Sequence, residues 1–299
     1  MKTLLLTDPM PAGEFIRAIH AIAPDTPLVE YRRDIGDVEL AGIEVVLGWR
    51  FPAGVAARLP NLKWVCSVAA GVEKLLVPDL APGVPVSRIV DAGQAEGIAQ
   101  FVVMMALRHA RGLATYEAQQ RERAWRRRPA AAVRSRVLVL GTGAMGGAVA
   151  RLLGVVGFEV HGWRRGGGVP LDALLAASDI VVCALPLTPQ TDSLLDARAF
   201  ALMPTGSYLI NIARGAHVVE ADLIDAVQCG HLAGAALDVQ RHEPMAVADP
   251  LWAVPGITIT PHIAAQSSAQ TIAAQFVAGL RCVQRGEVPP QTVDRGRGY

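Results

Sequence analysis

The sequence predicts an α/β protein made of two doubly wound parallel-sheet domains, a Rossmann-type domain and a flavodoxin-like domain. Two observations support this prediction. Short apolar runs of strand length alternate with helical stretches along most of the 299 residues. The apolar run 136–140 is followed by Gly141, Gly143 and Gly146 at GxGxxG spacing, and then by an alanine-rich helical stretch. A strand, a glycine turn and a helix in this order are typical of a dinucleotide-binding domain.

Length and charge exclude several classes of protein. At 299 residues the chain can bury two cores, and no apolar run reaches the about 20 residues that a membrane span requires. We therefore expect a soluble protein with no membrane partner. The 28 basic and 27 acidic residues nearly cancel, so no overall field favours nucleic acid. The locally basic run 121–128 is expected to be a solvated helix end or loop.

Cysteine usage and the chain start indicate the compartment. Cys66, Cys183, Cys229 and Cys282 are widely spaced and form no CxxC pair. We expect reduced thiols in a cytoplasmic protein, and we predict no metal site. The apolar part of MKTLLLTDPMP is too short for a secretory signal and is expected to form the first strand.

The first domain is predicted to hold an open parallel sheet. Strands are expected at residues 4–6, 28–30, 43–47, 64–67 and 84–87, with helical stretches such as 11–23 and 52–58 between them. The loop at 68–72 follows the fourth strand, and ligands bind at the carboxyl ends of parallel strands. A plain strand-to-helix turn is the alternative for this loop.

The second domain is predicted to begin with a long helix at 91–111. Its six strands are expected at residues 136–140, 158–162, 180–185, 207–212, 234–239 and 257–260, the number of a full doubly wound dinucleotide fold. A final helix at 267–285 can cross back and cover the first domain. The predicted domains are therefore 1–94 with 276–299, which would bind substrate, and 95–275, which would bind NADP.

The three glycines suit a bound dinucleotide. Gly141 allows the tight turn, Gly143 lets a pyrophosphate approach the backbone, and Gly146 lets the helix pack close to the strand. The phosphates would lie at the helix N-terminus. Glycine also serves ordinary turns, but the strand before, the helix after and the second strand at 158–162 favour the nucleotide site.

Cofactor preference depends on the end of that second strand. NAD enzymes of this fold place an acidic residue there, about 20 residues past the glycines, to bind the ribose hydroxyls. Arg164 occupies this place and Arg165 follows it. Two guanidinium groups can bind a 2′-phosphate, so we predict that NADPH is preferred over NADH. The alternative is that both arginines face solvent after Trp163.

Three polar residues follow apolar strands of the second domain and suit hydride transfer to a 2-oxo acid. Arg214 offers a planar fork for a carboxylate and a positive charge beside a carbonyl oxygen. His262 can deliver a proton, and Glu243 can hold the imidazole in one tautomer and favour the imidazolium. The alternatives are a capping or salt-bridging arginine, a surface glutamate and a satisfied buried histidine.

Several segments resemble the signature segments of the D-2-hydroxyacid dehydrogenase family, namely GTGAMG, LPLTPQTDSLLDARAFALMPTGSYLINIARG, LDVQRHEP and ITITPHIAA. HVVEADLIDAV, DPLW and the terminal VDRGRGY are similar to its glyoxylate/hydroxypyruvate reductase A group. The resemblance implies NAD(P)-dependent reduction of a small 2-oxo acid, with Arg214, Glu243 and His262 as catalytic residues. It also implies a homodimer formed through the nucleotide domains, and the broad apolar face of the helix beginning near Gly93 supports this.

The same resemblance assigns further site residues. The backbones of Ala70 and Gly71 would bind the substrate carboxylate, Trp49 would line the substrate site, and Asp238 would contact the nicotinamide carboxamide. The remaining residues expected around the cofactor are Ala144, Met145, Trp163, Leu185, Pro186 and Ala213.

Two other functions on this fold are weighed against the reductase. A nucleotide-sensing, corepressor-like binding protein should carry a peptide-docking surface and disordered extensions, and this compact chain shows neither. A formate-dehydrogenase-like enzyme would pair its histidine with an amide, whereas this chain offers Glu243.

Overall fold

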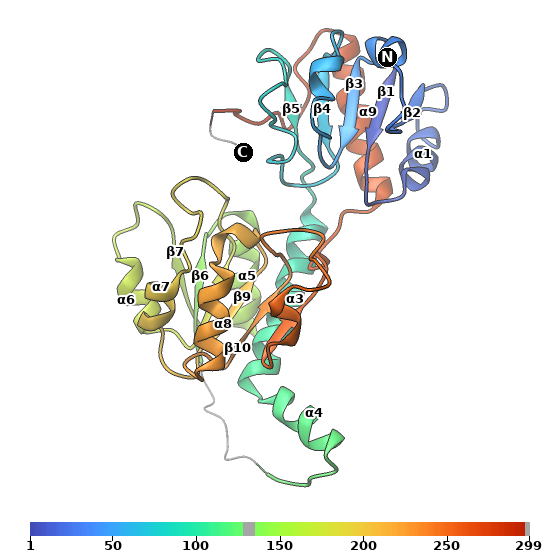
Figure 1. Cartoon of the computed structure of the whole chain (residues 1–299). Coiled ribbons are helices and arrows are strands. Elements are labelled where there is room, and N and C mark those ends of the chain that lie inside the picture. Colours follow the sequence, from blue (N-terminus) through green and yellow to red (C-terminus); the bar gives the residue numbers. More distant parts are fainter. Residues whose placement is uncertain (128–134, 297–299) are drawn as a thin grey trace. The chain divides into compact units, whose positions relative to one another are not determined.

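The computed structural model describes residues 1–127 and 135–296 and confirms the predicted α/β class with two parallel sheets (Figure 1). Arg128 of the basic run and the last three residues of VDRGRGY lie outside the described residues. The chain divides into unit 1, Met1–Ala92 with Gln266–Tyr299, and unit 2, Gly93–Ala265. The second junction lies at Gln266 rather than at residue 276, because α9 (Ala269–Gln284) belongs to unit 1 over its whole length.

Unit 1 holds five strands at the predicted places. The strands are β1 (Thr3–Leu6), β2 (Leu28–Glu30), β3 (Val45–Gly48), β4 (Trp64–Ser67) and β5 (Val86–Ser87). The helices are α1 (Ala12–His20), α2 (Asp37–Ala41), the 3-10 helix η1 (Ala56–Arg58) and α9. The sheet order is β2-β1-β3-β4-β5, which is flavodoxin-like, and all pairs are parallel. The helix predicted at 52–58 is wrong: only η1 forms, because Gly54 adopts a φ of +73° and interrupts the stretch.

The C-terminal helix of the chain is part of the unit 1 core. Helices α1 and α9 lie side by side on one face of the sheet (Figure 1). Trp64 of β4 stacks on Phe276 of α9 with ring centroids 5.3 Å apart. A Cβ at Gly279 would lie 2.5 Å from the Trp64 ring, so α9 approaches the sheet closely at this glycine.

Unit 2 holds the six predicted strands. They are β6 (Arg136–Leu140), β7 (Glu159–Trp163), β8 (Ile180–Cys183), β9 (Tyr208–Asn211), β10 (Gly234–Leu237) and β11 (Ile257–Ile259). The helices are α3 (Ala92–Ala110), α4 (Leu113–Arg121), α5 (Ala144–Val155), α6 (Leu171–Ala176), α7 (Ala197–Leu202) and α8 (Glu220–Gln228), with 3-10 helices η2 (Gly215–His217) and η3 (Pro250–Ala253).

The strand order of unit 2 differs from that of a full dinucleotide fold. The order is β11-β10-β9-β8-β6-β7, so β7 is an edge strand and, among the described residues, no strand pairs with its outer side. In the full fold a further strand lies beyond the second one. Here the chain passes from β7 to α6 through residues 164–170. The strand order reverses between β6 and β8, and ligands bind at such a switch point.

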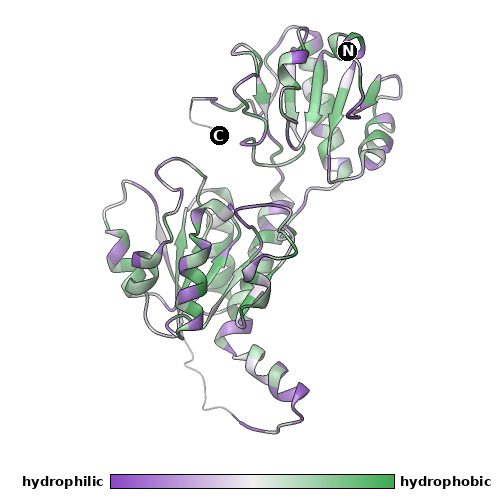
Figure 2. Ribbon diagram, viewed as in Figure 1, coloured by the Kyte–Doolittle hydropathy of each residue, from purple (hydrophilic) through white to green (hydrophobic). Residues whose placement is uncertain are grey.

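The inner strands of unit 2 are buried because helices cover both faces of the sheet. Helices α3 and α5 pack on one face, through residues such as Val102 and Leu153, and α7 and α8 pack on the other, through Phe200 and Leu223. The strands are accordingly apolar along their length, whereas the helices alternate apolar and polar sides (Figure 2). No helix in the described part of the chain is long and apolar enough to cross a membrane.

Helix α4 departs from this pattern. It extends away from the sheet of unit 2 (Figure 1), and none of its residues is buried. Leu113 and Tyr116 of α4 are exposed, as is Trp125 beyond its end, which is 98% exposed. Among the described residues, this region therefore carries several exposed apolar side chains.

Candidate active site

The glycine turn after β6 is held by close backbone contacts. Gly141 has a φ of +93°, and a Cβ there would lie 2.6 Å from the carbonyl oxygen of Ala184. A Cβ at Gly146 would lie 1.7 Å from the carbonyl oxygen of Gly141. Any side chain at either position would collide with main-chain atoms, so both must be glycine. A Cβ at Gly143 would meet nothing within 4 Å, which leaves open space above the turn.

The open space lies at the N-terminus of α5. Gly143 is the N-cap and offers no side chain to the first turn. Within residues 1–127 and 135–296, the N–H groups of Ala144 and Met145 donate to no protein acceptor. Unsatisfied N–H groups and the positive end of the helix dipole suit an anion. The residues present therefore fit the pyrophosphate of a dinucleotide.

The two arginines lie at the same edge of the sheet as the glycine turn. Leu140 pairs with Trp163 in the β6–β7 register, and the Gly141 N–H donates to the Trp163 carbonyl at 2.8 Å. Arg164 therefore follows β7 beside the turn. Both arginines are exposed, and Arg165 Nη1 donates to Gln190 Oε1 at 3.0 Å.

The Arg214 loop after β9 is shaped by a buried asparagine. The Asn211 side chain donates to the Arg214 carbonyl at 2.9 Å and accepts from the Ala213 N–H at 3.1 Å. Arg214 has extended backbone, and its Nη1 donates to the Ala213 carbonyl at 2.7 Å. A Cβ at Gly215 would lie 1.8 Å from the Gln240 carbonyl carbon. The loops after β9 and β10 are thus in main-chain contact.

Glu243 and His262 form a pair. Glu243 lies in the loop after β10, and His262 follows β11 with a φ of +57°. His262 Nδ1 lies 3.1 Å from Glu243 Oε2, and the two side chains are 30% and 19% exposed. The carboxylate and the imidazole are therefore partly shielded from water, which strengthens their interaction.

The loop that carries His262 is organised by Asp238 at the end of β10. The Asp238 side chain is buried and accepts from Thr260 Oγ1 at 2.6 Å and from the N–H groups of Ile263 and Ala264 at 2.8 Å each. The Asp238 carbonyl also accepts from the His262 N–H at 2.8 Å. The contact with a nicotinamide carboxamide stays a prediction, and the bonds observed here fix the position of His262.

The residues expected to bind substrate through unit 1 lie at the ends of neighbouring strands. Trp49 follows β3, and the Lys74 ammonium lies 4.9 Å from its ring centroid. The Ser67 hydroxyl donates to the Gly71 carbonyl at 2.7 Å and so shapes the loop after β4. In the described part of the chain the N–H groups of Ala70 and Gly71 have no protein acceptor. They can bind a carboxylate.

Sequence reasoning missed three residues that hold these loops together: Gly215, Arg241 and His217. His217 is fully buried, with Nδ1 2.9 Å from the Arg214 carbonyl oxygen and Nε2 3.3 Å from that of Pro186. Burial lowers the pKa of His217 and so favours the neutral ring, which can donate to only one of these two carbonyls. The ring lies between the Arg214 loop and the loop after β8. No periodicity marks such residues, although a glycine directly after Arg214 could have suggested a close backbone contact.

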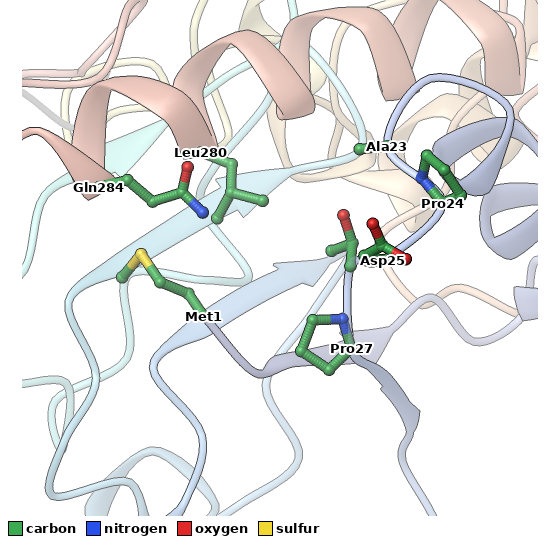
Figure 3. Close-up of a pocket in the computed structure, with 8 residues that line it drawn as sticks. Met1, Ala23, Pro24, Asp25, Pro27, Leu280 and Gln284 are labelled. Atoms are coloured by element: carbon green, nitrogen blue, oxygen red, sulfur yellow. The ribbon is translucent and has the colours of Figure 1, made fainter.

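A surface hollow in unit 1 does not belong to the candidate site. It has a volume of about 220 Å³ and lies between residues 23–27, Met1, Leu280 and Gln284 (Figure 3). Met1 and residues 23–27 precede β1 and β2, and Leu280 and Gln284 belong to α9. The hollow is thus at the amino ends of these strands, opposite the edge where parallel sheets bind ligands. Asp25 supplies its only charged side chain and is exposed.

The fold and the site define a class of protein. A glycine turn that fits a dinucleotide, an arginine at a strand end and a carboxylate–imidazole pair together are the equipment of a nicotinamide-dependent oxidoreductase. Residues 103–264 match the family described as D-isomer specific 2-hydroxyacid dehydrogenase, NAD binding domain. The chain belongs to this family of NAD(P)-dependent oxidoreductases, as the resemblance predicted.

Two relatives within this family are similar to the chain over most of its length. The chain is 33% identical over 306 aligned positions to glyoxylate/hydroxypyruvate reductase A of Yersinia enterocolitica, an alignment that covers 96% of each chain. It is 35% identical to the protein of the same name from Serratia proteamaculans, over 86% of this chain and 88% of that one.

Solved structures of proteins from this family have a similar fold. A D-isomer specific 2-hydroxyacid dehydrogenase from Xanthobacter autotrophicus Py2, in complex with NADPH and MES, is 37% identical, with a TM-score of 0.87 and coverage of 100% of this chain and 99% of that one. An NADPH-dependent glyoxylate/hydroxypyruvate reductase from Sinorhizobium meliloti, in complex with NADP and sulfate, is 29% identical, with a TM-score of 0.87 over the whole of both chains.

Proposed function

We propose that this enzyme reduces a small 2-oxo acid of the glyoxylate or hydroxypyruvate type to the 2-hydroxy acid, with NADPH. The single observation that carries the proposal is the Glu243–His262 pair, 3.1 Å between Oε2 and Nδ1, on the unit that holds the glycine turn. Reduction of a carbonyl consumes one hydride and one proton. The names of the reductase relatives support the substrate class.

His262 and Glu243 handle the proton. With Nδ1 facing the Glu243 carboxylate, Nε2 is the atom that delivers a proton to the carbonyl oxygen of the substrate. Glu243 fixes the orientation of the ring and stabilises the imidazolium before transfer. When bound, NADPH supplies the hydride, which goes to the carbonyl carbon.

Arg214 binds the substrate. Its guanidinium holds the carboxylate through paired N–H donors and stabilises the negative charge that develops on the carbonyl oxygen. The Asn211 side chain holds the backbone of the loop, and the Ala213 carbonyl accepts a bond from the Arg214 guanidinium. These bonds support a charge that is held in place before the reaction.

The two units divide the binding task. Unit 1 binds substrate, with the N–H groups of Ala70 and Gly71 on the carboxylate and Trp49 beside the substrate. Unit 2 binds NADP through the glycine turn, with Asp238 at the carboxamide. The further cofactor contacts are Ala144, Met145, Trp163, Leu185, Pro186 and Ala213.

NADPH is preferred over NADH because Arg164 and Arg165 receive the 2′-phosphate. Their exposed guanidinium groups beside Gly141 support this assignment. An acidic residue at this place would repel the phosphate, whereas arginine binds it with charge-assisted bonds. The NADPH and NADP complexes of the structural relatives agree with this preference.

The enzyme works as a homodimer in the cytoplasm. Exposed apolar residues lie on α3, on α4 and just beyond α4, among them Met104, Leu107, Leu113 and Trp125, and they support contact with a second copy of the chain. The four free thiols agree with a reducing compartment. A folded, active monomer in sedimentation at micromolar concentration would contradict the dimer.

A panel of 2-oxo acids assayed with NADPH and NADH, following absorbance of the reduced cofactor, tests the function. Glyoxylate or hydroxypyruvate should be turned over, with NADPH the better cofactor. A protein that binds NADPH but reduces no 2-oxo acid would support the nucleotide-sensing alternative.

A further inference from the structure

Arg241 makes an unusual set of contacts. It lies in the loop after β10, two places before Glu243. One nitrogen, Nη2, donates to the Ala216 carbonyl at 2.8 Å and to the Ser193 hydroxyl at 3.0 Å. The same nitrogen lies 3.3 Å from Asp192 Oδ1 and 3.4 Å from the Val218 carbonyl.

The acceptors of Arg241 belong to two other loops of the same sheet edge. Asp192 and Ser193 lie between β8 and α7, while Ala216 and Val218 follow Arg214. Those two loops are also joined by their backbones, since the Ser193 N–H donates to the Ala216 carbonyl at 2.8 Å. Arg241 ties the loop of Glu243 to both.

These contacts differ from an ordinary surface ion pair. The Arg241 side chain is only 32% exposed, and two of its four acceptors are main-chain carbonyls that cannot rotate away. The backbone N–H of Arg241 adds a bond to Glu220 Oε1 at 2.8 Å. The Ser193 hydroxyl, and then the Arg241 guanidinium, hold the pKa of Asp192 below its ordinary value.

We propose that Arg241 is a positioning residue for the reduction. It holds the loop of Glu243 in a fixed position relative to the loop of Arg214. The inference rests on the proposed function, because it assumes that these two residues act on one substrate. Catalysis depends on the relative position of the groups that act on the substrate, since displacing one of them by about 1 Å can lower the rate roughly 100-fold.

The test compares Arg241→Met with Arg58→Met. Arg58 is a matched control in unit 1, because its Nε donates to Asp37 at 2.6 Å and its Nη2 to the Ile35 carbonyl at 2.9 Å. In Arg241→Met we expect kcat/KM for hydroxypyruvate to fall about 10- to 100-fold, while NADPH affinity is nearly unchanged. The upper limb of its pH profile should move to lower pH, because Glu243 holds His262 less well. Arg58→Met should leave kcat/KM and the pH profile unchanged.

Arg241→Lys sharpens the comparison. Because a single nitrogen makes all four side-chain contacts, an ammonium with three donors can replace part of them. We therefore expect Lys to recover part of the lost rate and of the pH profile. If Arg241 served folding alone, the loss of rate in each variant would instead parallel its loss of melting temperature, and the pH profile would not move.

Amide hydrogen exchange gives a readout that needs no turnover. Peptides covering 213–219 and 239–245 should exchange faster in Arg241→Met and not in Arg58→Met. Unchanged exchange and kinetics in Arg241→Met, beside an active wild type, would overturn the role of Arg241 alone. A wild type that reduces no 2-oxo acid would overturn the proposed function and with it the role in reduction.

Discussion

The two sheets share the order of their first five strands but present different chemistry at their carboxyl ends. In unit 1 the switch point between β1 and β3 carries an exposed ion pair, Asp8 with Arg50 at 2.7 Å. In unit 2 the equivalent point carries the glycine turn and the open N-terminus of α5. The topology fixes where a ligand can bind, and the loop residues decide whether one does.

Other loops at the carboxyl ends of the two sheets also differ in chemistry. Unit 1 offers mainly backbone donors, such as the N–H groups of Ala70 and Gly71. Unit 2 brings the side chains of Arg214, Glu243 and His262 to its loops. Bonds from the buried Asn211 and Asp238 hold the backbones of the Arg214 and His262 loops. Groups that react need fixed positions, so these bonds agree with the proposed role of the three side chains.

The largest expected effect distinguishes the Glu243–His262 pair from a similar pair elsewhere in the chain. General acid catalysis contributes about 10²- to 10⁴-fold, so His262→Ala should lower kcat by that factor with NADPH affinity nearly unchanged. His161 is the matched control, because its Nε2 lies 3.1 Å from Glu159 on the edge strand β7. Steady-state kinetics of both variants checks this, and equal losses would remove His262 from the chemistry.

Gly215 tests whether the loops of unit 2 depend on backbone contact. In Gly215→Ala the new Cβ would lie 1.8 Å from the Gln240 carbonyl carbon, so the two loops must separate. We expect kcat/KM to fall by about 100-fold and the melting temperature to drop. The control is Gly83→Ala in unit 1, where a Cβ meets nothing within 4 Å. Wild-type kinetics in Gly215→Ala would show that the loop contact is dispensable.

Arg164 tests the assignment of the cofactor phosphate to unit 2. A charged hydrogen bond contributes about 1.5–3 kcal/mol, so Arg164→Ala should weaken NADPH roughly 10- to 100-fold and leave NADH nearly unchanged. Catalytic efficiency with both cofactors measures this, with the exposed Arg151→Ala on α5 as control. Equal losses with both cofactors would contradict the assignment, as would a wild type that favours NADH.

The smallest effect concerns pH and stability. Burial lowers the pKa of His217, so the folded protein keeps this ring neutral while the unfolded chain takes up a proton below about pH 6.5. The free energy of unfolding should therefore fall as pH drops through that region, by at most about 1.4 kcal/mol per pH unit from this group. In His217→Gln the melting temperature should differ less between pH 7.5 and 5.5 than in the wild type. An equal difference in both proteins would show that His217 does not titrate in this way.

Much of the fold could be predicted because the inner strands are buried on both faces and therefore form apolar runs in the sequence. Strand order could not, since no local pattern shows that β7 is an edge. Helix α4 was missed because none of its residues is buried, so it lacks an apolar stripe. The helix predicted at 52–58 was lost to the backbone of Gly54.

The candidate site follows a similar division. Arg214, Glu243 and His262 were recognisable as polar residues after apolar strands. The residues that secure them were not, because Arg241 and His217 act through contacts with loops distant in sequence. Asp238 was expected at the cofactor, whereas its observed bonds run to the loop of His262.

The pH dependence of kcat/KM in Glu243→Gln, beside the wild type, tests the central claim most directly. Both would be assayed with hydroxypyruvate and NADPH. If the carboxylate stabilises the protonated His262 through the 3.1 Å contact, the amide variant should lose activity at a lower pH on the alkaline side of the profile. If the alkaline limb lies at the same pH in Glu243→Gln as in the wild type, the claim that Glu243 stabilises the protonated His262 is contradicted.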